Sequence, residues 1–293
     1  MTVYLSSSCY GRRPLREAIE LCKKITKDRV EISAPHDFQP NNELAAILKE
    51  YKEEGIKFTL HNYFPVPEKS IVLNMAAGDK EQYEASRNLV KNALFLADIA
   101  GAPLYGIHAG YLSKAKADNK GNFIFDNEEE RYEVALNRTL NFINSVIKDF
   151  DKKGISLIIE NLFPSPKKRH SLNCTVAEIR ELMSQTPKNV GFLLDLGHLN
   201  VSSVILDFDR NKALDQILDE FSNRLLEVHI SENNGLKDEH LAVKKHSWQL
   251  EALSKINKAT LNNKKEIIYC IEARNADEYE LKNSVDLVNN IIS

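Results

Sequence analysis

The segment FDKKGISLIIEN, residues 150–161, contains in order the end of a helix, a glycine, an apolar strand and a polar terminus. The same order is found in YKEEGIKFTLHN, residues 51–62, where Gly55 stands at a typical position for a helix to end. A helix-to-strand step that occurs twice in one chain indicates a fold built from repeated α/β units.

Apolar runs that suit β-strands recur along the chain. They span residues 2–7, 29–33, 57–63, 104–110, 155–162, 190–198, 225–231 and 266–274. Several are apolar almost throughout, which is typical of parallel strands covered on both faces. The segments between them have the spacing of amphipathic helices, with one apolar face formed by Leu15, Ala18, Ile19 and Cys22 and another by Leu44, Ile47, Leu48 and Tyr51. A capping box at Thr175 and Glu178 marks the start of a further helix.

This alternation predicts an α/β fold, a single (β/α)8 TIM barrel that occupies residues 1–293 as one domain. About eight strand–helix units suit a chain of 293 residues, and no linker-like stretch interrupts the series. The main alternative is a doubly wound open sheet. Such a sheet usually has a glycine-rich phosphate turn after its first strand, and SSSCYGRR (residues 6–13) does not match that pattern.

The connections between the expected elements are unequal in length. Those that lead from helix to strand are short, whereas those that leave the strands are long, at residues 62–80, 111–127, 163–174, 199–210 and 232–246. In a barrel, long loops after the strands build the C-terminal face, where active sites lie. We therefore expect the active site at the C-terminal end of the strands.

The composition is that of an ordinary globular protein. Hydrophobic residues make up 43% of the chain, charged residues make up 28%, and the net charge is -3, so nothing overall indicates a surface for polyanions. The four cysteines form no CxxC pair, which favours free thiols in a reducing compartment. There is no signal-peptide pattern, and no apolar stretch approaches the roughly 20 residues of a membrane span. We expect a cytoplasmic protein without a membrane partner.

Ionisable side chains stand where the predicted strands end. The third to eighth strands and the loops after them supply His61, His108, Glu160, Asp195, His198, His229, Asp238, His240 and Glu272, and the second strand carries Glu31. Taken singly, each has an ordinary alternative as a hydrogen-bonded core histidine, an ion-paired carboxylate or a turn cap. Barrel closure would gather them at one mouth, where they would repel or lie unpaired without a metal. The pattern predicts a divalent cation, and mixed histidine and carboxylate ligands favour zinc, manganese, iron or cobalt over calcium.

Motif order and strand placement resemble those of the xylose isomerase-like barrel superfamily, through IIEN (158–161), DLGH (195–198), VHIS (228–231), KDEH (237–240) and CIEA (270–273). Its members include sugar isomerases, ketose epimerases, inosose dehydratases and the endonuclease IV family. The resemblance covers nearly the whole chain and implies a shared metal set of Glu160, Asp195, His229 and Glu272.

In the isomerase and epimerase branch, the residues that match Glu160 and Glu272 remove and return a proton alpha to a carbonyl. The metal holds the substrate oxygens and stabilises the enediolate. The resemblance therefore implies a metal-dependent isomerase or epimerase that acts on a sugar or sugar phosphate. Zinc and manganese are the favoured ions.

The endonuclease IV branch holds three zinc ions, and this chain has a matching residue for every ligand. The resemblance implies one site of His61, His108 and Glu160, a second of Glu160, Asp195, His229 and Glu272, and a third of His198, Asp238 and His240. The alternative function is therefore a multinuclear zinc phosphodiesterase that cuts at apurinic sites, with nucleic acid as a partner only in that case. One to three ions are expected.

The loop after the third strand departs from the endonuclease pattern. The segment NYFPVPEKSIVLNMAAGD (62–79) is longer than the loop whose wedge residues enter DNA, although Tyr63 and Phe64 are available for that role. The acidic net charge also gives little support for a duplex-binding face.

Candidate substrate contacts are His198, Asn161 and Lys237, and His198 resembles the residue that contacts a substrate oxygen in the isomerase branch. The basic segment KKR (167–169) is either a phosphate site or a solvated loop tip. The resemblance also allows a homodimer. A third hypothesis is a binding protein with a vestigial metal site.

Overall fold

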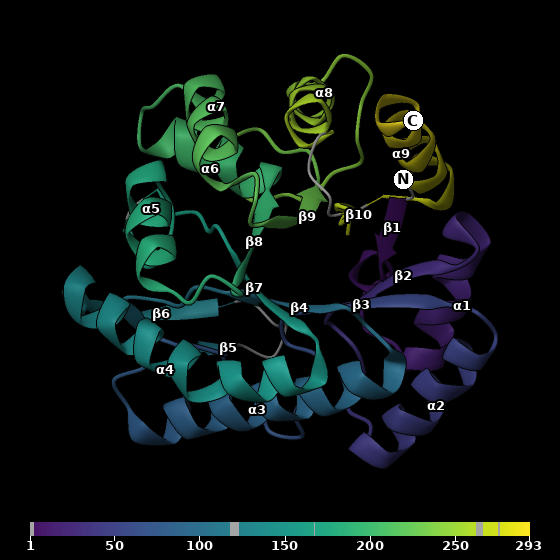
Figure 1. Cartoon of the computed structure of the whole chain (residues 1–293), viewed down its shortest axis with the longest axis horizontal. Coiled ribbons are helices and arrows are strands. Elements are labelled where there is room, and N and C mark those ends of the chain that lie inside the picture. The colour runs from purple at the N-terminus through teal and green to yellow at the C-terminus, as the bar shows by residue number, and fades with distance from the viewer. Residues whose placement is uncertain (1–2, 118–122, 167, 262–265, 275) are drawn as a thin grey trace.

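The computed structural model describes residues 3–117, 123–166, 168–261, 266–274 and 276–293. The strands of its main sheet are β1 (Val3–Ser6), β2 (Arg29–Ile32), β3 (Lys57–His61), β4 (Leu104–His108), β7 (Ser156–Glu160), β8 (Gly191–Asp195), β9 (Leu225–Ile230) and β10 (Ile268–Ile271). All pair in parallel and close in the order β1-β10-β9-β8-β7-β4-β3-β2. Figure 1 shows this ring of strands with helices around it. The predicted (β/α)8 barrel is confirmed.

Helices cover the outside of the barrel. They are α1 (Leu15–Thr26), α2 (Asn41–Glu53), α3 (Lys80–Ala100), α4 (Tyr132–Lys153), α5 (Val176–Gln185), α6 (Leu196–Ile205), α7 (Arg210–Phe221), α8 (Trp248–Thr260) and α9 (Glu278–Ile292), with a short 3-10 helix η1 (Ser7–Tyr10). The capping box predicted at the start of α5 is present between Thr175 and Glu178. The apolar faces predicted for α1 and α2 are buried.

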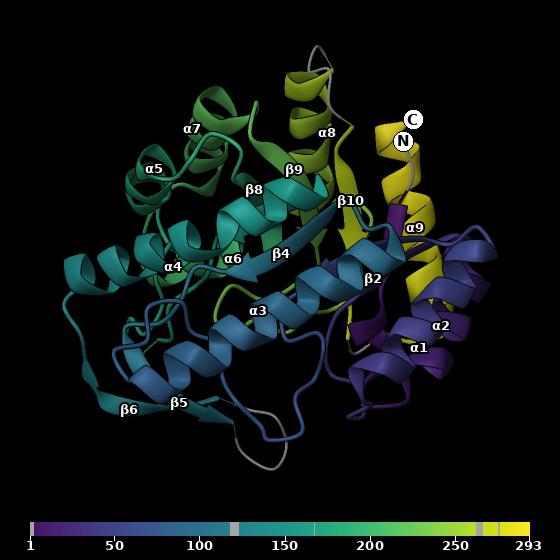
Figure 2. The same cartoon turned by 60° about the horizontal axis from the view of Figure 1, so that its bottom comes forward.

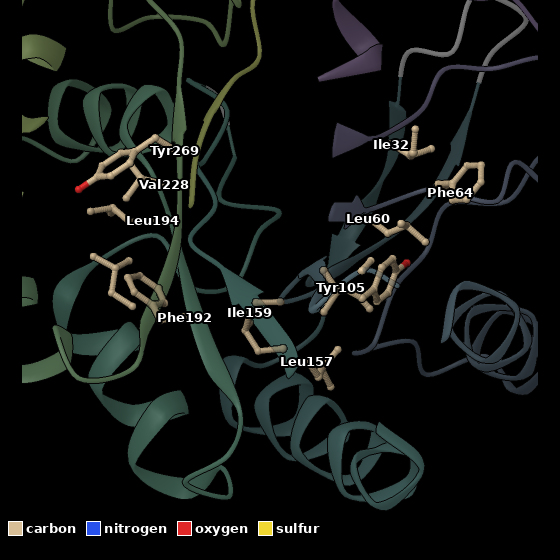
Figure 3. Packing of buried hydrophobic residues seen from close by; sticks show 14 of the residues in the cluster. Ile32, Leu60, Phe64, Tyr105, Leu157, Ile159, Phe192, Leu194, Val228 and Tyr269 are labelled. Atoms are coloured by element: carbon tan, nitrogen blue, oxygen red, sulfur yellow. The ribbon is translucent and has the colours of Figure 1, made fainter. Parts of the chain in front are cut away.

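Side chains along each barrel strand alternate between two regions. Ile159 belongs to the main core between the strands and the helices, part of which Figure 3 shows. Its neighbours Ile158 and Glu160 take the other face, towards the barrel interior. There Ile158 packs with Leu104 and Leu193 in a small separate cluster. On β4, β7 and β8, the interior is therefore apolar below the level at which Glu160 ends its strand.

The connection after β4 is more ordered than the sequence pattern suggested. Instead of a plain loop, residues 111–127 include most of an antiparallel hairpin formed by β5 (Ser113–Ala117) and β6 (Phe123–Glu129). Figure 2 shows this hairpin apart from the ring of barrel strands. Ala115 and Tyr111 pack in one buried apolar cluster, which ties the hairpin to the mouth of the barrel.

The sixth predicted strand is also too long. The run 190–198 ends its strand at Asp195, and the residues after it begin α6. The cause is local, because the Asp195 carboxylate accepts a hydrogen bond of 2.7 Å from the His198 N–H and so caps the helix. Most of the predicted loop 199–210 is consequently helical.

The four cysteines, Cys9, Cys22, Cys174 and Cys270, are free, as predicted, and they are also buried. Trp248 is buried in the outer core. In the part of the chain that the structure describes, no helix has both the length and the apolar composition that crossing a membrane requires.

Candidate metal centre

The side chains predicted to bind metal lie together at the C-terminal mouth of the barrel. Their nitrogen and oxygen atoms form groups whose members lie within 4.8 Å of one another, namely His61–His108–Glu160, Glu160–Asp195–His198, Asp195–His229–Glu272 and His198–Asp238–His240. The groups overlap at Glu160, Asp195 and His198 and form one continuous set, which we call the mouth cluster. All of the predicted ligand residues belong to it.

At one side of the mouth cluster, two histidines converge on one carboxylate oxygen. Glu160 Oε2 lies 2.9 Å from His61 Nε2 and 3.1 Å from His108 Nε2. The other ring nitrogens meet hydroxyl groups: His61 Nδ1 lies 3.3 Å from Ser33 Oγ, and His108 Nδ1 lies 2.9 Å from the Tyr111 hydroxyl. Each histidine thus has one nitrogen for the cluster and one supported from outside it, as metal-bound histidines do.

The opposite side has the same design. Asp238 Oδ2 lies 2.6 Å from His240 Nε2 and 3.5 Å from His198 Nε2. The outer nitrogens point to backbone carbonyls, since His198 Nδ1 lies 2.8 Å from the Asn161 oxygen and His240 Nδ1 lies 2.9 Å from the Glu272 oxygen. The carbonyls fix both rings with Nε2 turned towards the shared carboxylate.

His229 lies in the middle of the cluster and faces three carboxylates. Its Nδ1 is 3.3 Å from Glu272 Oε2, 3.9 Å from Asp195 Oδ2 and 4.0 Å from Glu160 Oε1. Its Nε2 donates instead to Glu31 Oε2 across 2.8 Å. The set of one imidazole nitrogen and three carboxylates is the arrangement that the resemblance implied.

Glu272 is held from the side away from His229. Its Oε1 accepts a hydrogen bond of 3.1 Å from the Ser8 hydroxyl and one of 2.5 Å from the Arg274 guanidinium. Arg274 is itself partly exposed at the mouth, so it is a cation that a substrate can reach.

Without an ion, the mouth cluster sets opposed charges together away from water. Burial works against ionisation of Glu160, yet the imidazole of His108 helps to hold its pKa well below the usual value. Burial raises the pKa of Asp195 to about 6. Although burial acts to lower it, the carboxylates of Asp195 and Asp238 hold the pKa of His198 well above its ordinary value. Protons therefore occupy positions that a divalent cation would take, and the cation would displace them.

Several buried atoms of the mouth cluster lack a hydrogen-bond partner among the described residues. They are Glu160 Oε1, Asp195 Oδ2, His229 Nδ1 and Asp238 Oδ1. Buried polar atoms are normally paired, and these are atoms that can present a lone pair to a cation. Mixed nitrogen and oxygen donors suit zinc, manganese, iron or cobalt. The residues present therefore fit a divalent ion.

The predicted substrate contacts differ in position. His198 lies inside the mouth cluster. The Asn161 amide is used within the protein, because it donates to the Asp195 carbonyl oxygen and accepts from the Asp195 N–H, across 3.0 and 2.8 Å. Asn161 therefore shapes the end of β8. Lys237 is exposed on the loop after β9.

The basic segment 167–169 does not present free charges where it is described. Arg169 forms an ion pair with Glu178, and Lys168 Nζ donates to the backbone and side-chain oxygens of Asn127. Lys167 lies outside the described residues. To bind a phosphate group, Lys168 and Arg169 would have to give up these contacts.

The wedge positions considered for DNA entry are occupied by packing. Phe64 is fully buried. Tyr63 is partly buried against His108, with ring centroids 5.8 Å apart, and its hydroxyl lies 3.3 Å from that of Tyr111. Both rings support the mouth of the barrel in this conformation.

Sequence reasoning missed the residues that support the mouth cluster, above all Ser8, Ser33, Tyr111 and Arg274. A signal existed for Arg274, because residues two apart at a strand end share a face and Arg274 follows Glu272 at that spacing. Ser33 follows Glu31 at the same spacing in the predicted strand 29–33, whereas Tyr111 lies in a loop without periodicity.

The sequence and the fold are similar to those of known proteins. The model of the xylose isomerase-like TIM barrel family matches residues 17–261. An uncharacterized protein of Methanocaldococcus jannaschii is 28% identical over 196 residues, which are 65% of this chain and 61% of that protein. The chain therefore covers less than two thirds of that relative.

Solved structures of similar shape include two sugar epimerases. A D-tagatose 3-epimerase-like protein has a TM-score of 0.74 at 18% identity, over 100% of this chain and 97% of that one. The D-psicose 3-epimerase of Clostridium cellulolyticum, solved with D-tagatose, has a TM-score of 0.71 at 13% identity over the full length of both chains. A Thermus thermophilus protein soaked with zinc chloride has a TM-score of 0.62 at 15% identity, over 99% of this chain and 98% of that one.

At such identities, the structural likeness shows the fold alone. The family model, in contrast, matches most of the sequence. The barrel, its C-terminal mouth cluster and this match lead to one conclusion: the chain belongs to the xylose isomerase-like TIM barrel family.

Proposed function

We propose that this chain is a metal-dependent isomerase or epimerase of a sugar or sugar phosphate, with Glu160 and Glu272 as the acid and base. The observation that carries the proposal is the set of one imidazole nitrogen and three carboxylates around His229 Nδ1, formed with Glu272, Asp195 and Glu160. The similarity in fold to D-tagatose and D-psicose 3-epimerases supports this reaction class.

The two glutamates are held so that each keeps one oxygen for chemistry. Glu272 Oε1 is occupied by Ser8 and Arg274. His61 and His108 both contact Glu160 Oε2, whereas Glu160 Oε1 has no hydrogen-bond partner among the described residues. Fixed carboxylates of this kind can transfer protons without first rearranging.

A divalent ion in the mouth cluster would hold the substrate oxygens and offset the negative charge that develops on them. One glutamate removes the proton from the carbon beside the substrate carbonyl, and the electron pair moves towards the carbonyl oxygen to give an enediolate. The other glutamate, which must enter the step protonated, gives its proton to the same carbon from the opposite side, which inverts it, or to the neighbouring carbon. In the second case the proton of the neighbouring hydroxyl passes to the former carbonyl oxygen, and the carbonyl moves. His198 would donate a hydrogen bond to a substrate oxygen.

Solvent-deuterium incorporation tests the proposal. With zinc or manganese supplied, the wild-type chain is expected to introduce deuterium beside the carbonyl of a ketose or ketose phosphate, and Glu160→Gln is expected to stop this exchange. Full exchange in that variant would show that the acid/base assignment is wrong.

A second candidate function is a multinuclear zinc phosphodiesterase. The observation that favours it is the pair of flanking groups, His61–His108–Glu160 and His198–Asp238–His240, which an enzyme with a single ion does not require. The buried Phe64 and the net charge of -3 do not favour binding to duplex DNA.

Metal content and reaction together separate the two functions. About one ion per chain with deuterium exchange identifies an isomerase or epimerase, and about three zinc ions with nicking of an abasic duplex identify the phosphodiesterase. The same purified protein, assayed both ways at one salt concentration, serves for both measurements.

A further inference from the structure

Glu31 is a buried carboxylate for which the proposed reaction has no role. It lies on β2, which supplies none of the predicted metal ligands, and its side chain is fully buried in the barrel interior. In the ring of strands, β1 and β10 lie between β2 and β9, so Glu31 reaches its partner on β9 across the interior. That partner is His229, whose Nε2 lies 2.8 Å from Glu31 Oε2.

The two nitrogens of His229 have separate tasks. Nε2 donates to Glu31, while Nδ1 faces the carboxylates of Glu272 and Asp195 and has no hydrogen-bond partner among the described residues. A neutral imidazole carries one proton, so a proton fixed on Nε2 leaves the lone pair on Nδ1. The opposite tautomer would point a proton into the centre of the mouth cluster.

The partner of His229 differs from those of the comparable histidines. The outer nitrogens of His61 and His108 meet hydroxyl groups, and that of His240 meets a backbone carbonyl oxygen. His229 has a carboxylate instead. A charge-assisted hydrogen bond holds a ring more firmly than a neutral one and makes its other nitrogen a better ligand.

We propose that Glu31 is a positioning residue that fixes the Nε2–H tautomer of His229 and so prepares Nδ1 to bind the divalent ion. The inference rests on the proposed metal site and adds a residue to its machinery. Glu31 acts through His229 and does not touch the ion or the substrate.

Glu227 provides a matched control. It lies on β9 two residues before His229, it is as fully buried as Glu31, and neither of its carboxylate oxygens has a hydrogen-bond partner among the described residues. Replacing Glu227 with glutamine therefore changes a buried carboxyl group of the same strand and interior that forms no hydrogen bond with His229.

The experiment measures zinc affinity by competition with a chelator at pH 7.5, together with zinc content at saturation. Glu31→Gln is expected to weaken zinc binding by roughly 10- to 100-fold with the same number of ions bound at saturation. Glu227→Gln is expected to stay within about threefold of wild type, since the control leaves the hydrogen bond between Glu31 and His229 in place. Glu31→Asp keeps the charge and serves as a second variant if the glutamine form does not fold.

Nitrogen-15 NMR of the histidines in the metal-free protein, recorded at a pH high enough for His229 to be neutral, gives a readout that a general loss of stability would not change. His229 is expected as the Nε2–H tautomer in wild type and in Glu227→Gln, and as a mixture of tautomers in Glu31→Gln.

Unchanged zinc affinity in a folded Glu31→Gln variant would overturn the inference. So would the loss of one bound ion at saturation, because Glu31 would then be a ligand; Glu31, His61 and His229 do lie within 4.8 Å of one another. If wild type binds no divalent ion, the proposed function is wrong. If wild type binds zinc and Glu31→Gln binds it equally well, only the inference about Glu31 is wrong.

Discussion

On β7 and β8, the upper and lower side chains that face the barrel interior have opposite chemistry, although the same strands carry both. On β7, Glu160 belongs to the mouth cluster, while Ile158, two residues earlier, belongs to the apolar cluster. On β8, Asp195 likewise belongs to the mouth cluster, while Leu193, two residues earlier, belongs to the apolar cluster. The lower residues bury apolar surface and stabilise the fold. The upper ones place carboxylates together away from water, which is unfavourable until a cation binds. One strand thus supports folding at one level and chemistry at the next.

The largest expected contrast comes from substitutions two residues apart on β7. Glu160→Gln should lower the rate of proton transfer by about 10²- to 10⁴-fold, because the amide cannot accept the proton. Ile158→Val should leave that rate within a few-fold of wild type and lower the free energy of unfolding by about 1 kcal/mol. Deuterium exchange and urea unfolding measure the two effects. If Ile158→Val were as inactive as Glu160→Gln, the upper and lower residues would not have separate functions.

Removal of the metal should destabilise the upper level. With free zinc at about 1,000 times its dissociation constant, the bound ion should add about 4 kcal/mol to the free energy of unfolding. Adding a chelator should therefore lower the melting temperature by roughly 10 °C. Differential scanning calorimetry with and without the chelator checks this, and identical curves would count against an ion in the mouth cluster.

A cavity in the lower level should lower the stability of the fold without changing metal binding. Leu104 is buried in the apolar cluster, four residues before His108 on β4. Leu104→Ala should lower the free energy of unfolding by about 2–5 kcal/mol, through lost burial and the cavity left behind. Zinc content at saturation should not change. Loss of zinc in a variant that is still folded would mean that the two levels are not independent.

The smallest expected effect concerns His36, a buried histidine outside the mouth cluster. Its Nε2 lies 3.0 Å from Ser7 Oγ, and burial is the main cause that lowers its pKa to about 4. Because the folded state excludes a proton that the unfolded chain accepts at a pKa near 6.5, this neutral histidine contributes stability above pH 6.5. That contribution is lost as the pH falls towards 4, by about 2–3 kcal/mol at pH 4.5.

Unfolding of wild type and His36→Gln at pH 7.5 and pH 4.5 isolates this contribution, because acid effects on the mouth cluster are common to both proteins. The difference in stability between them should shrink by about 2–3 kcal/mol at the lower pH. A difference that does not change with pH would mean that His36 is not held neutral by burial.

Much of the fold and of the candidate site was predictable from the sequence. Barrel closure follows from the spacing of the apolar runs, and strand ends such as His61 and Glu160 must then meet at one mouth. The start of α6 was also readable in principle, since Asp195 is a good helix N-cap. The strand was extended past it because the apolar run continues through Leu196.

Other features depend on contacts that no periodicity encodes. The hairpin of β5 and β6 is held by packing of Ala115 with Tyr111, and its apolar run, residues 123–125, is too short to predict a strand. The hydrogen bond between Glu31 and His229 joins strands that are not neighbours in the ring, so it depends on side-chain reach across the interior. Strand spacing fixes which residues meet at the mouth, but it does not fix which nitrogen of a ring faces inwards.

The central claim, that closure of the barrel gathers these side chains into a cation site, is tested most directly by metal analysis of protein purified without added metal and then titrated with zinc. We predict at least one tightly bound equivalent per chain in wild type and its loss in the double variant Glu160→Gln and His229→Ala. A folded wild-type protein that binds no zinc or manganese at micromolar concentration would contradict the account.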